Sequence, residues 1–239
     1  MGLMKTGIPG LDEVFKGGIL EGSSVLVTGA PGTGKTIFAL QFIAEGLRNK
    51  EPCLYITSEE SAASLRRYAK EIGAEIEKHE DGLLQIYEQD LTSRKILSLE
   101  EPLNAIKTRG IKRIVLDSLT LFEYVYYESK IDFRKGILDF IKHTKKMGST
   151  LLATSEKTNL EIDEIKFSAQ DFIFEGLVHL TMIRKGSMFE RCIHIPKMRG
   201  QDHLLDIFPM SITEKGMVVH TKQIPFSLIE QDVMKSRRK

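Results

Sequence analysis

The sequence has few cysteines and almost no net charge, and both shortages exclude classes of protein. Only two cysteines, Cys53 and Cys192, occur in 239 residues, far apart in apolar segments and without a C-x-x-C pair. They predict packed thiols in a reducing compartment, and not a disulfide framework or a metal site. The 34 basic residues nearly balance the 33 acidic ones, which leaves a net charge of +1. No general attraction to nucleic acid or to an acidic membrane follows from that balance.

Long apolar runs and internal repeats are missing as well. No stretch of about eighteen apolar residues occurs and no apolar segment follows the N-terminus, so we expect a cytoplasmic protein without a membrane span or secretion signal. The absence of repeats predicts a single copy of the fold. With 41% hydrophobic residues, the chain can bury the core of one large α/β domain. We assign residues 1–221 to this domain, with 1–22 as an N-terminal lead-in, and residues 222–239 to a flexible tail.

One segment carries a phosphate-binding pattern. Residues 29–36 read Gly-Ala-Pro-Gly-Thr-Gly-Lys-Thr and fit G-x-x-x-x-G-K-[ST], between an apolar run at 24–28 and a helix-like run at 37–43. Glycines in this pattern let backbone N–H groups converge on a phosphate at the start of a helix. Lys35 would contact the β- and γ-phosphates and Thr36 would bind Mg²⁺, which a plain glycine-rich turn would not explain. The residues expected at the nucleotide are Ala30, Pro31, Gly32, Thr33, Gly34, Lys35, Thr36 and Ile37.

Strand-like and helix-like segments alternate through the first two-thirds of the chain. The expected strands are residues 24–28, 53–57, 83–87, 112–118 and 149–154. The alternation predicts an α/β fold with a mostly parallel sheet flanked by helices. From residue 177 the pattern changes: strands at 178–183 and 189–195 around a turn predict an antiparallel hairpin. Two shorter strands, at 209–213 and 217–220, would complete a β meander.

Polar residues follow several of these strands, at the edge where a parallel sheet collects its ligands. Asp117 is predicted to hold Mg²⁺ through water, although it could instead cap the next segment. Glu59 and Glu60 are candidates to orient the attacking water, or else to cap the following helix. Adjacent extended residues point to opposite faces, so one glutamate meets the water, and we favour Glu59. Thr154 and Ser155 either contact the γ-phosphate or simply end their strand.

Two cations close the second strand of the expected hairpin. Lys197 and Arg199 flank Met198 and lie on the same face of an extended chain. One interpretation is an edge strand whose charges discourage pairing. The functional interpretation is a pair of cations directed at the phosphates of a neighbouring subunit, where they would stabilise transition-state charge.

These motifs together resemble a single-domain member of the KaiC family within the RecA-like P-loop ATPases. The resemblance runs from residue 6 to about residue 220, with every motif in family order. The matching segments are Thr-Gly-Ile-Pro-Gly-Leu-Asp at 6–12, the glycines at 17–18, the P-loop, Ser-Glu-Glu-Ser at 58–61, Leu-Asp-Ser at 116–118 and Lys-Met-Arg-Gly at 197–200.

The resemblance implies a RecA-like core that assembles as a six-membered ring, with ATP between neighbours. It gives Glu59 and Glu60 the catalytic positions beside the P-loop, and has Lys197 and Arg199 reach ATP from the next subunit. The match to the family continues without gaps downstream of Lys197. It places Met198 and three later residues at the nucleotide across that interface, namely His203, Thr213 and Glu214. Glu214 stands where the family commonly has Asp.

Two departures from the family's clock protein bear on function. That protein has two tandem copies of the domain, whereas this chain has one. Residues 169–173, Ala-Gln-Asp-Phe-Ile, take the place of the adjacent Ser-Thr pair that the clock protein phosphorylates. The sequence therefore predicts an ATP-hydrolysing ring that regulates an unidentified protein partner, and not a circadian autokinase.

Two alternatives remain open. A RecA- or RadA-like filament would thread DNA past loops 119–130 and 155–170, but these loops are acidic or aromatic, which disfavours a nucleic-acid partner. The second alternative is a nucleotide-dependent scaffold, or an autokinase with a different phosphosite such as Ser168.

Overall fold

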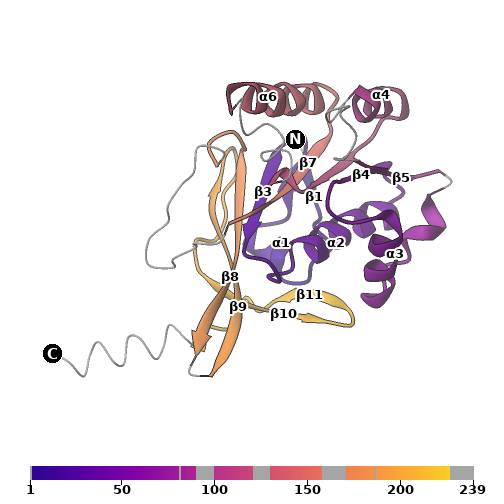
Figure 1. Cartoon of the computed structure of the whole chain (residues 1–239). Coiled ribbons are helices and arrows are strands. Elements are labelled where there is room, and N and C mark those ends of the chain that lie inside the picture. The colour runs from indigo at the N-terminus through magenta and orange to yellow at the C-terminus, as the bar shows by residue number, and fades with distance from the viewer. Residues whose placement is uncertain are drawn as a thin grey trace.

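The computed structural model describes residues 2–80, 82–89, 100–120, 130–157, 171–185 and 187–226. A nine-stranded sheet runs through these residues in the order β11-β10-β9-β8-β3-β7-β6-β4-β5 (Figure 1). The six strands from β8 to β5 are parallel, and β9, β10 and β11 continue the sheet antiparallel. The strands are β3 (Ser24–Gly29), β4 (Cys53–Thr57), β5 (Leu84–Glu88), β6 (Arg113–Asp117), β7 (Thr150–Glu156), β8 (Gly176–Lys185), β9 (Met188–Met198), β10 (Phe208–Thr213) and β11 (Gly216–Val219).

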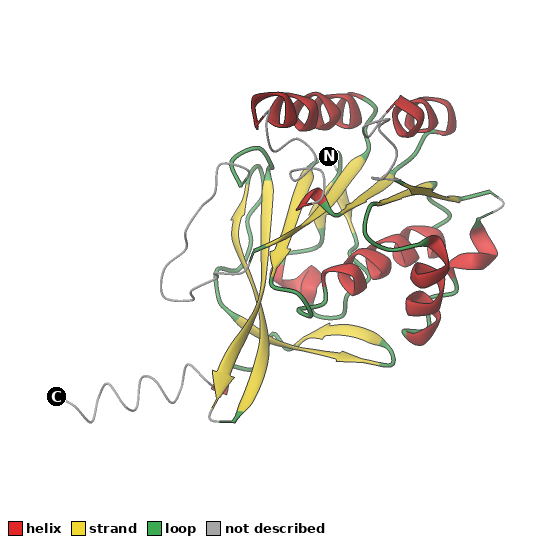
Figure 2. Cartoon of the chain, in the orientation of Figure 1, coloured by secondary structure: helices red, strands yellow, loops and turns green. Residues whose placement is uncertain are grey.

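Helices cover both faces of the sheet (Figure 2). Side chains alternate along β3, so Val25 and Val27 join the core on one face while Leu26 joins the core on the other. The first core packs under α1 (Leu11–Val14), α2 (Lys35–Arg48), α3 (Ala62–Glu71) and the 3₁₀ helix η1 (Ile76–His79). The second core packs under α4 (Glu100–Arg109) and α6 (Lys130–Lys146). None of the helices described here is both long and apolar enough to cross a bilayer.

The predicted α/β class, with a mostly parallel sheet and antiparallel C-terminal strands, is confirmed. The meander is more closely joined to the core than the sequence indicated, because β8 pairs in parallel with β3, from Val25 opposite Gly176 to Gly29 opposite Leu180. Strand β7 also extends beyond its expected end at Thr154 to Glu156, which lies opposite Gly29. That register places Glu156 at the level where the P-loop begins.

The lead-in is tied to the domain by a buried cation. It forms a small two-stranded sheet of β1 (Leu3–Met4) and β2 (Ile19–Leu20). Arg113 is only 1% exposed and donates to the carbonyl oxygens of Lys5 at 2.7 Å and Phe42 at 3.0 Å. Its Nε also bonds Glu51 at 2.5 Å, and its guanidinium lies 4.7 Å from the centre of the Phe42 ring. The Arg113 side chain therefore links the N-terminal lead-in and α2 to β6.

Both cysteines are buried free thiols, as expected. Burial raises the pKa of Cys53 and of Cys192 to about 12, which keeps each thiol protonated. They therefore act as apolar packing groups in the two halves of the sheet.

Candidate functional site

The P-loop connects the end of β3 to the start of α2, and its glycines are sterically required. A Cβ on Gly29 would lie 2.5 Å from the Leu180 carbonyl oxygen, and Gly34 has a φ of +105°. Thr33 closes the loop by donating its hydroxyl to the Ala30 carbonyl at 2.8 Å. Gly34 is the N-cap of α2 and has no side chain to bond the first N–H groups of the helix. The loop thus offers backbone donors at a positive helix end, which fits a phosphate group.

Lys35 lies among carboxylates at the start of α2. Its ammonium donates to the carbonyl oxygens of Gly29 at 3.0 Å and Ala30 at 3.2 Å. Partial burial lowers the pKa of Lys35, while the negative charges of Glu156, Asp117 and Glu59 oppose that shift. The three carboxylates favour the charged ammonium, which is the form that would contact phosphate.

Asp117, at the end of β6, meets the P-loop as the sequence predicted. Thr36 donates its hydroxyl to Asp117 Oδ2 at 3.1 Å, so the two proposed Mg²⁺ ligands lie together. Hydroxyl and carboxylate oxygens are the donors that Mg²⁺ prefers, and the pair therefore fits the cation. Tyr55 from β4 donates to the same Oδ2 at 2.7 Å, and Thr154 from β7 donates to Oδ1. Thr154 thus contacts Asp117, a role that neither interpretation of its sequence position included.

The two glutamates after β4 point to different surroundings. Glu59 accepts a hydrogen bond from Ser118 Oγ and faces Lys35, Asp117 and Glu156. Desolvation raises the pKa of Glu59, the Ser118 hydrogen bond opposes the rise, and repulsion from Asp117 and Glu156 adds to it. A raised pKa makes the carboxylate a stronger base.

Glu60 faces α3 instead, where the Tyr68 hydroxyl lies 3.3 Å from its Oε2. The N-cap of α3 is Ser61, whose Oγ accepts the Ser64 N–H at 3.1 Å. Among the described contacts, neither glutamate caps that helix. The geometry is consistent with the preference for Glu59 over Glu60.

Sequence reasoning missed three residues that the fold brings to this edge of the sheet. The sequence predicts Glu156 in the loop 155–170, yet its charge acts on both Lys35 and Glu59. Ser118 follows Asp117 directly and bonds Glu59. The Arg191 guanidinium comes within 3.5 Å of the Gly32 carbonyl oxygen. The sequence contained a signal only for Ser118, which lies within the Leu-Asp-Ser motif.

Comparison with known proteins shows the family of this chain. A family model described as the KaiC ATPase matches residues 4–224. The chain belongs to the KaiC ATPase family. A UPF0273 protein of Pyrococcus furiosus is 30% identical to it over 92% of this chain and 95% of the relative. The crystal structure of a KaiC-like protein from Pyrococcus horikoshii OT3 superposes with a TM-score of 0.79 at 32% identity, and covers 92% of this chain and 99% of that one.

The circadian clock oscillator protein KaiC of Prochlorococcus marinus subsp. pastoris is also similar. It is 31% identical over 90% of this chain, but the match covers only 44% of the clock protein's length. This KaiC-family chain therefore spans less than half of that relative.

In this KaiC-family chain, Lys197 and Arg199 lie at the sheet edge opposite the P-loop. Met198 at the end of β9 pairs with Gly176, which pairs with Val25 near the start of β3. The P-loop follows Gly29, four residues further along β3, which corresponds to about 13 Å of extended strand. Lys197 and Arg199 are therefore separated from the P-loop of their own chain by most of the sheet.

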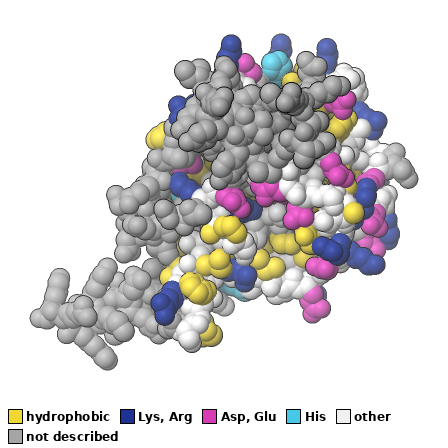
Figure 3. Space-filling view, in the orientation of Figure 1, with side chains coloured by type: hydrophobic (Ala, Val, Ile, Leu, Met, Phe, Trp, Pro, Cys, Tyr) yellow, Lys and Arg dark blue, Asp and Glu magenta, His cyan; other side chains and the backbone are white. Residues whose placement is uncertain are grey.

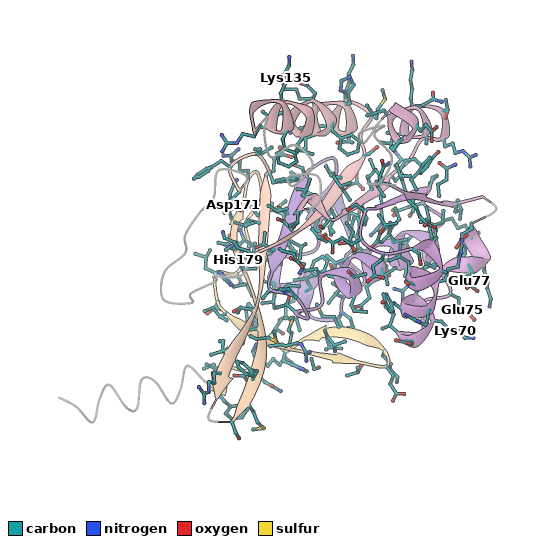
Figure 4. All side chains as sticks on the ribbon, in the orientation of Figure 1. Lys70, Glu75, Glu77, Lys135, Asp171 and His179 are labelled. Carbon is teal, nitrogen blue, oxygen red and sulfur yellow. The ribbon has the colours of Figure 1, made fainter. Side chains whose placement is uncertain are left out.

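The environments of these residues differ. Lys197 Nζ donates to the carbonyl oxygens of Asp171 at 2.8 Å and Phe174 at 2.5 Å, and burial lowers the Lys197 pKa. Asp171 is labelled beside the β8–β9 hairpin in Figure 4. Arg199 is exposed, whereas Met198 is 6% exposed and packs into the core, so only the Met198 backbone could reach a ligand.

The other residues predicted at the subunit interface lie in two different parts of the structure. His203 is half-buried in the loop after β9. Thr213 and Glu214 are exposed at the turn between β10 and β11, where Thr213 Oγ1 donates to the Gly216 carbonyl at 3.3 Å. Because β10 runs antiparallel to β9, this turn lies toward the other edge of the sheet. Contact of these residues with a neighbour's nucleotide stays a prediction.

Proposed function

We propose that this chain hydrolyses ATP with Mg²⁺ at the C-terminal edge of its parallel sheet. The observation that carries the proposal is the convergence of the P-loop pair Lys35 and Thr36 with Asp117 and Glu59 from two other strands. Adjacent strands β3, β7, β6 and β4 deliver these groups to one edge. The KaiC ATPase family assignment supports the same chemistry.

Each group has a role that its surroundings favour. The P-loop backbone and Lys35 bind the β- and γ-phosphates. Thr36 and Asp117 would hold Mg²⁺, which when bound neutralises charge on the phosphate oxygens. Glu59 orients the attacking water and accepts its proton, which the raised pKa of this carboxylate favours.

We further propose that the site is completed in a homohexameric ring, in the cytoplasm, whose nucleotide state regulates a protein partner. Lys197 and Arg199 lie too far along the sheet to serve the P-loop of their own chain. A neighbouring copy arranged head to tail could present them to it, and head-to-tail contacts form a ring when their rotation closes. Lys197 is held by two carbonyls of its own chain, so Arg199 is the freer cation in this arrangement.

Phosphate release with and without Mg²⁺ tests the first proposal. We expect Mg²⁺-dependent turnover by the wild type, and losses of at least about a hundredfold for Lys35→Ala and for Asp117→Asn. A Lys78→Ala variant is a matched control, because Lys78 is an exposed residue of η1 that bonds Glu75, the residue before that helix. Turnover that survives Lys35→Ala would reject the P-loop as the site.

Solution mass with and without ATP and Mg²⁺ tests the ring. A mass near six chains that depends on nucleotide supports it, whereas a monomer or an open-ended series of masses contradicts it.

A DNA-binding filament is the alternative to this ring. On the described part of the face in Figure 3, basic and acidic side chains are interspersed. Turnover stimulated by single-stranded DNA, with a steep dependence on salt, would favour the filament. Ser168, the other candidate phosphosite, lies outside the described residues.

A further inference from the structure

The Asp117 carboxylate is held by hydroxyl groups from three elements. Tyr55 donates to Oδ2 at 2.7 Å, Thr36 donates to Oδ2 at 3.1 Å, and Thr154 donates to Oδ1. A carboxylate has about four acceptor positions, so these hydroxyls of the described residues leave about one for another ligand. The proposed mechanism uses Thr36 but gives no role to Tyr55 or Thr154.

Strand register explains how Tyr55 reaches Asp117. Thr57 lies opposite Asp117 and Tyr55 lies opposite Val115, so Tyr55 stands on the same face of the sheet, two residue pairs before Asp117. Its ring belongs to the apolar core between the sheet and α2, and the residue is 1% exposed. The phenol O–H is a hydrogen-bond donor, and its 2.7 Å bond to Oδ2 aims it at the carboxylate from within this core.

A phenylalanine would fill the same space in the core. What Tyr55 adds is a buried hydroxyl, which costs free energy unless it is hydrogen-bonded. That hydroxyl donates to a carboxylate oxygen at the predicted metal site and not to a backbone carbonyl. The Tyr55 hydroxyl therefore helps to orient the Asp117 carboxylate.

We propose that Tyr55 is a positioning residue for Mg²⁺ and, together with Thr154, fixes the plane of the Asp117 carboxylate. The acceptor position that remains would then be available to Mg²⁺, which Thr36 and Asp117 would hold. Thr36 is compatible with this arrangement, because a hydroxyl can bind a cation through a lone pair while it donates its proton to Oδ2. The inference rests on the proposed Mg²⁺-dependent ATP site.

The Tyr55→Phe variant tests the inference by nucleotide binding, which requires no turnover. A fluorescent, non-hydrolysable ATP analogue is titrated in EDTA and then across a range of Mg²⁺ concentrations. We expect the Mg²⁺ concentration for half-maximal tightening of binding to rise about tenfold, with affinity in EDTA unchanged. Tyr68→Phe is the matched control, because it removes a hydroxyl that faces Glu60 and should leave the Mg²⁺ midpoint unchanged.

An unchanged Mg²⁺ midpoint in Tyr55→Phe overturns the inference, even if the variant unfolds at lower denaturant. Should that variant fail to fold, Thr154→Val removes the donor on Oδ1 and should raise the midpoint, while Thr154→Ser should restore it. A wild type that binds the analogue more tightly with Mg²⁺ but releases no phosphate refutes the ATPase proposal alone. A wild type on which Mg²⁺ has no effect overturns the inference.

Discussion

The sharpest functional prediction separates Glu59 from Glu60. Replacing Glu59 by Gln removes the base while keeping the size of the side chain and its hydrogen-bonding capacity toward Ser118. General-base catalysis contributes about 10²–10⁴ in rate, so we expect kcat for ATP hydrolysis to fall by that factor. ATP affinity should change little, because Glu59 is placed to act on the water while the P-loop holds the phosphates.

Glu60→Gln is the built-in control for this experiment. Its carboxylate faces Tyr68 on α3, so we expect kcat within a fewfold of the wild type. Phosphate release measures kcat, and a fluorescent ATP analogue measures affinity in both variants. A Glu59→Gln enzyme with wild-type turnover, or a Glu60→Gln enzyme with the larger loss, would refute the assignment of Glu59 as the water-orienting residue.

Two further predictions concern pH and stability. Ser118→Ala removes the hydrogen bond that lowers the Glu59 pKa, so the acid limb of the plot of kcat against pH should move to higher pH. An acid limb that does not move would show that Ser118 does not control the Glu59 pKa. Arg113→Ala deletes a buried cation with bonds to Lys5, Phe42 and Glu51, and should cost about 3–5 kcal/mol of unfolding free energy in urea. Arg66→Ala, at a partly exposed pair with Glu80, should cost no more than about 1 kcal/mol; equal losses would contradict the role of burial.

The parts of the site that the sequence predicted well are those whose chemistry is local. The P-loop glycines and Lys35 follow one another in eight residues, and the structure places them between a strand and a helix as expected. Asp117 could be predicted because polar residues at the ends of parallel strands meet at one sheet edge. Its contact with Thr36 follows from that rule.

Residues that act through strand register could not be predicted in this way. Tyr55 reads as a core residue of a buried strand, and its contact with Asp117 depends on β4 lying beside β6. The sequence predicts a loop at Glu156 because it does not mark where a strand ends, whereas β7 continues to Glu156, which lies opposite Gly29. Thr154 donates a hydrogen bond to Asp117, and this contact depends on β7 lying beside β6.

The hairpin illustrates a different limit. Its two strands and its turn follow from local pattern, but the parallel pairing of β8 with β3 joins segments about 150 residues apart, a non-local contact that periodicity does not reveal. That pairing is what carries Lys197 and Arg199 to the edge away from their own P-loop. Their action on a neighbour's nucleotide stays a prediction, and the register shows only that both cations lie away from their own P-loop.

Subunit mixing tests the central claim, a P-loop site completed by a second copy of the chain. Lys35→Ala and Arg199→Ala subunits should each be nearly inactive alone, because one lacks the P-loop cation and the other the cation supplied to its neighbour. In rings assembled from equal amounts, about half of the P-loops are intact and about half of their neighbours carry Arg199, so about one quarter of the interfaces become competent. Recovery near a quarter of wild-type phosphate release supports the claim; a mixture no more active than its components contradicts it.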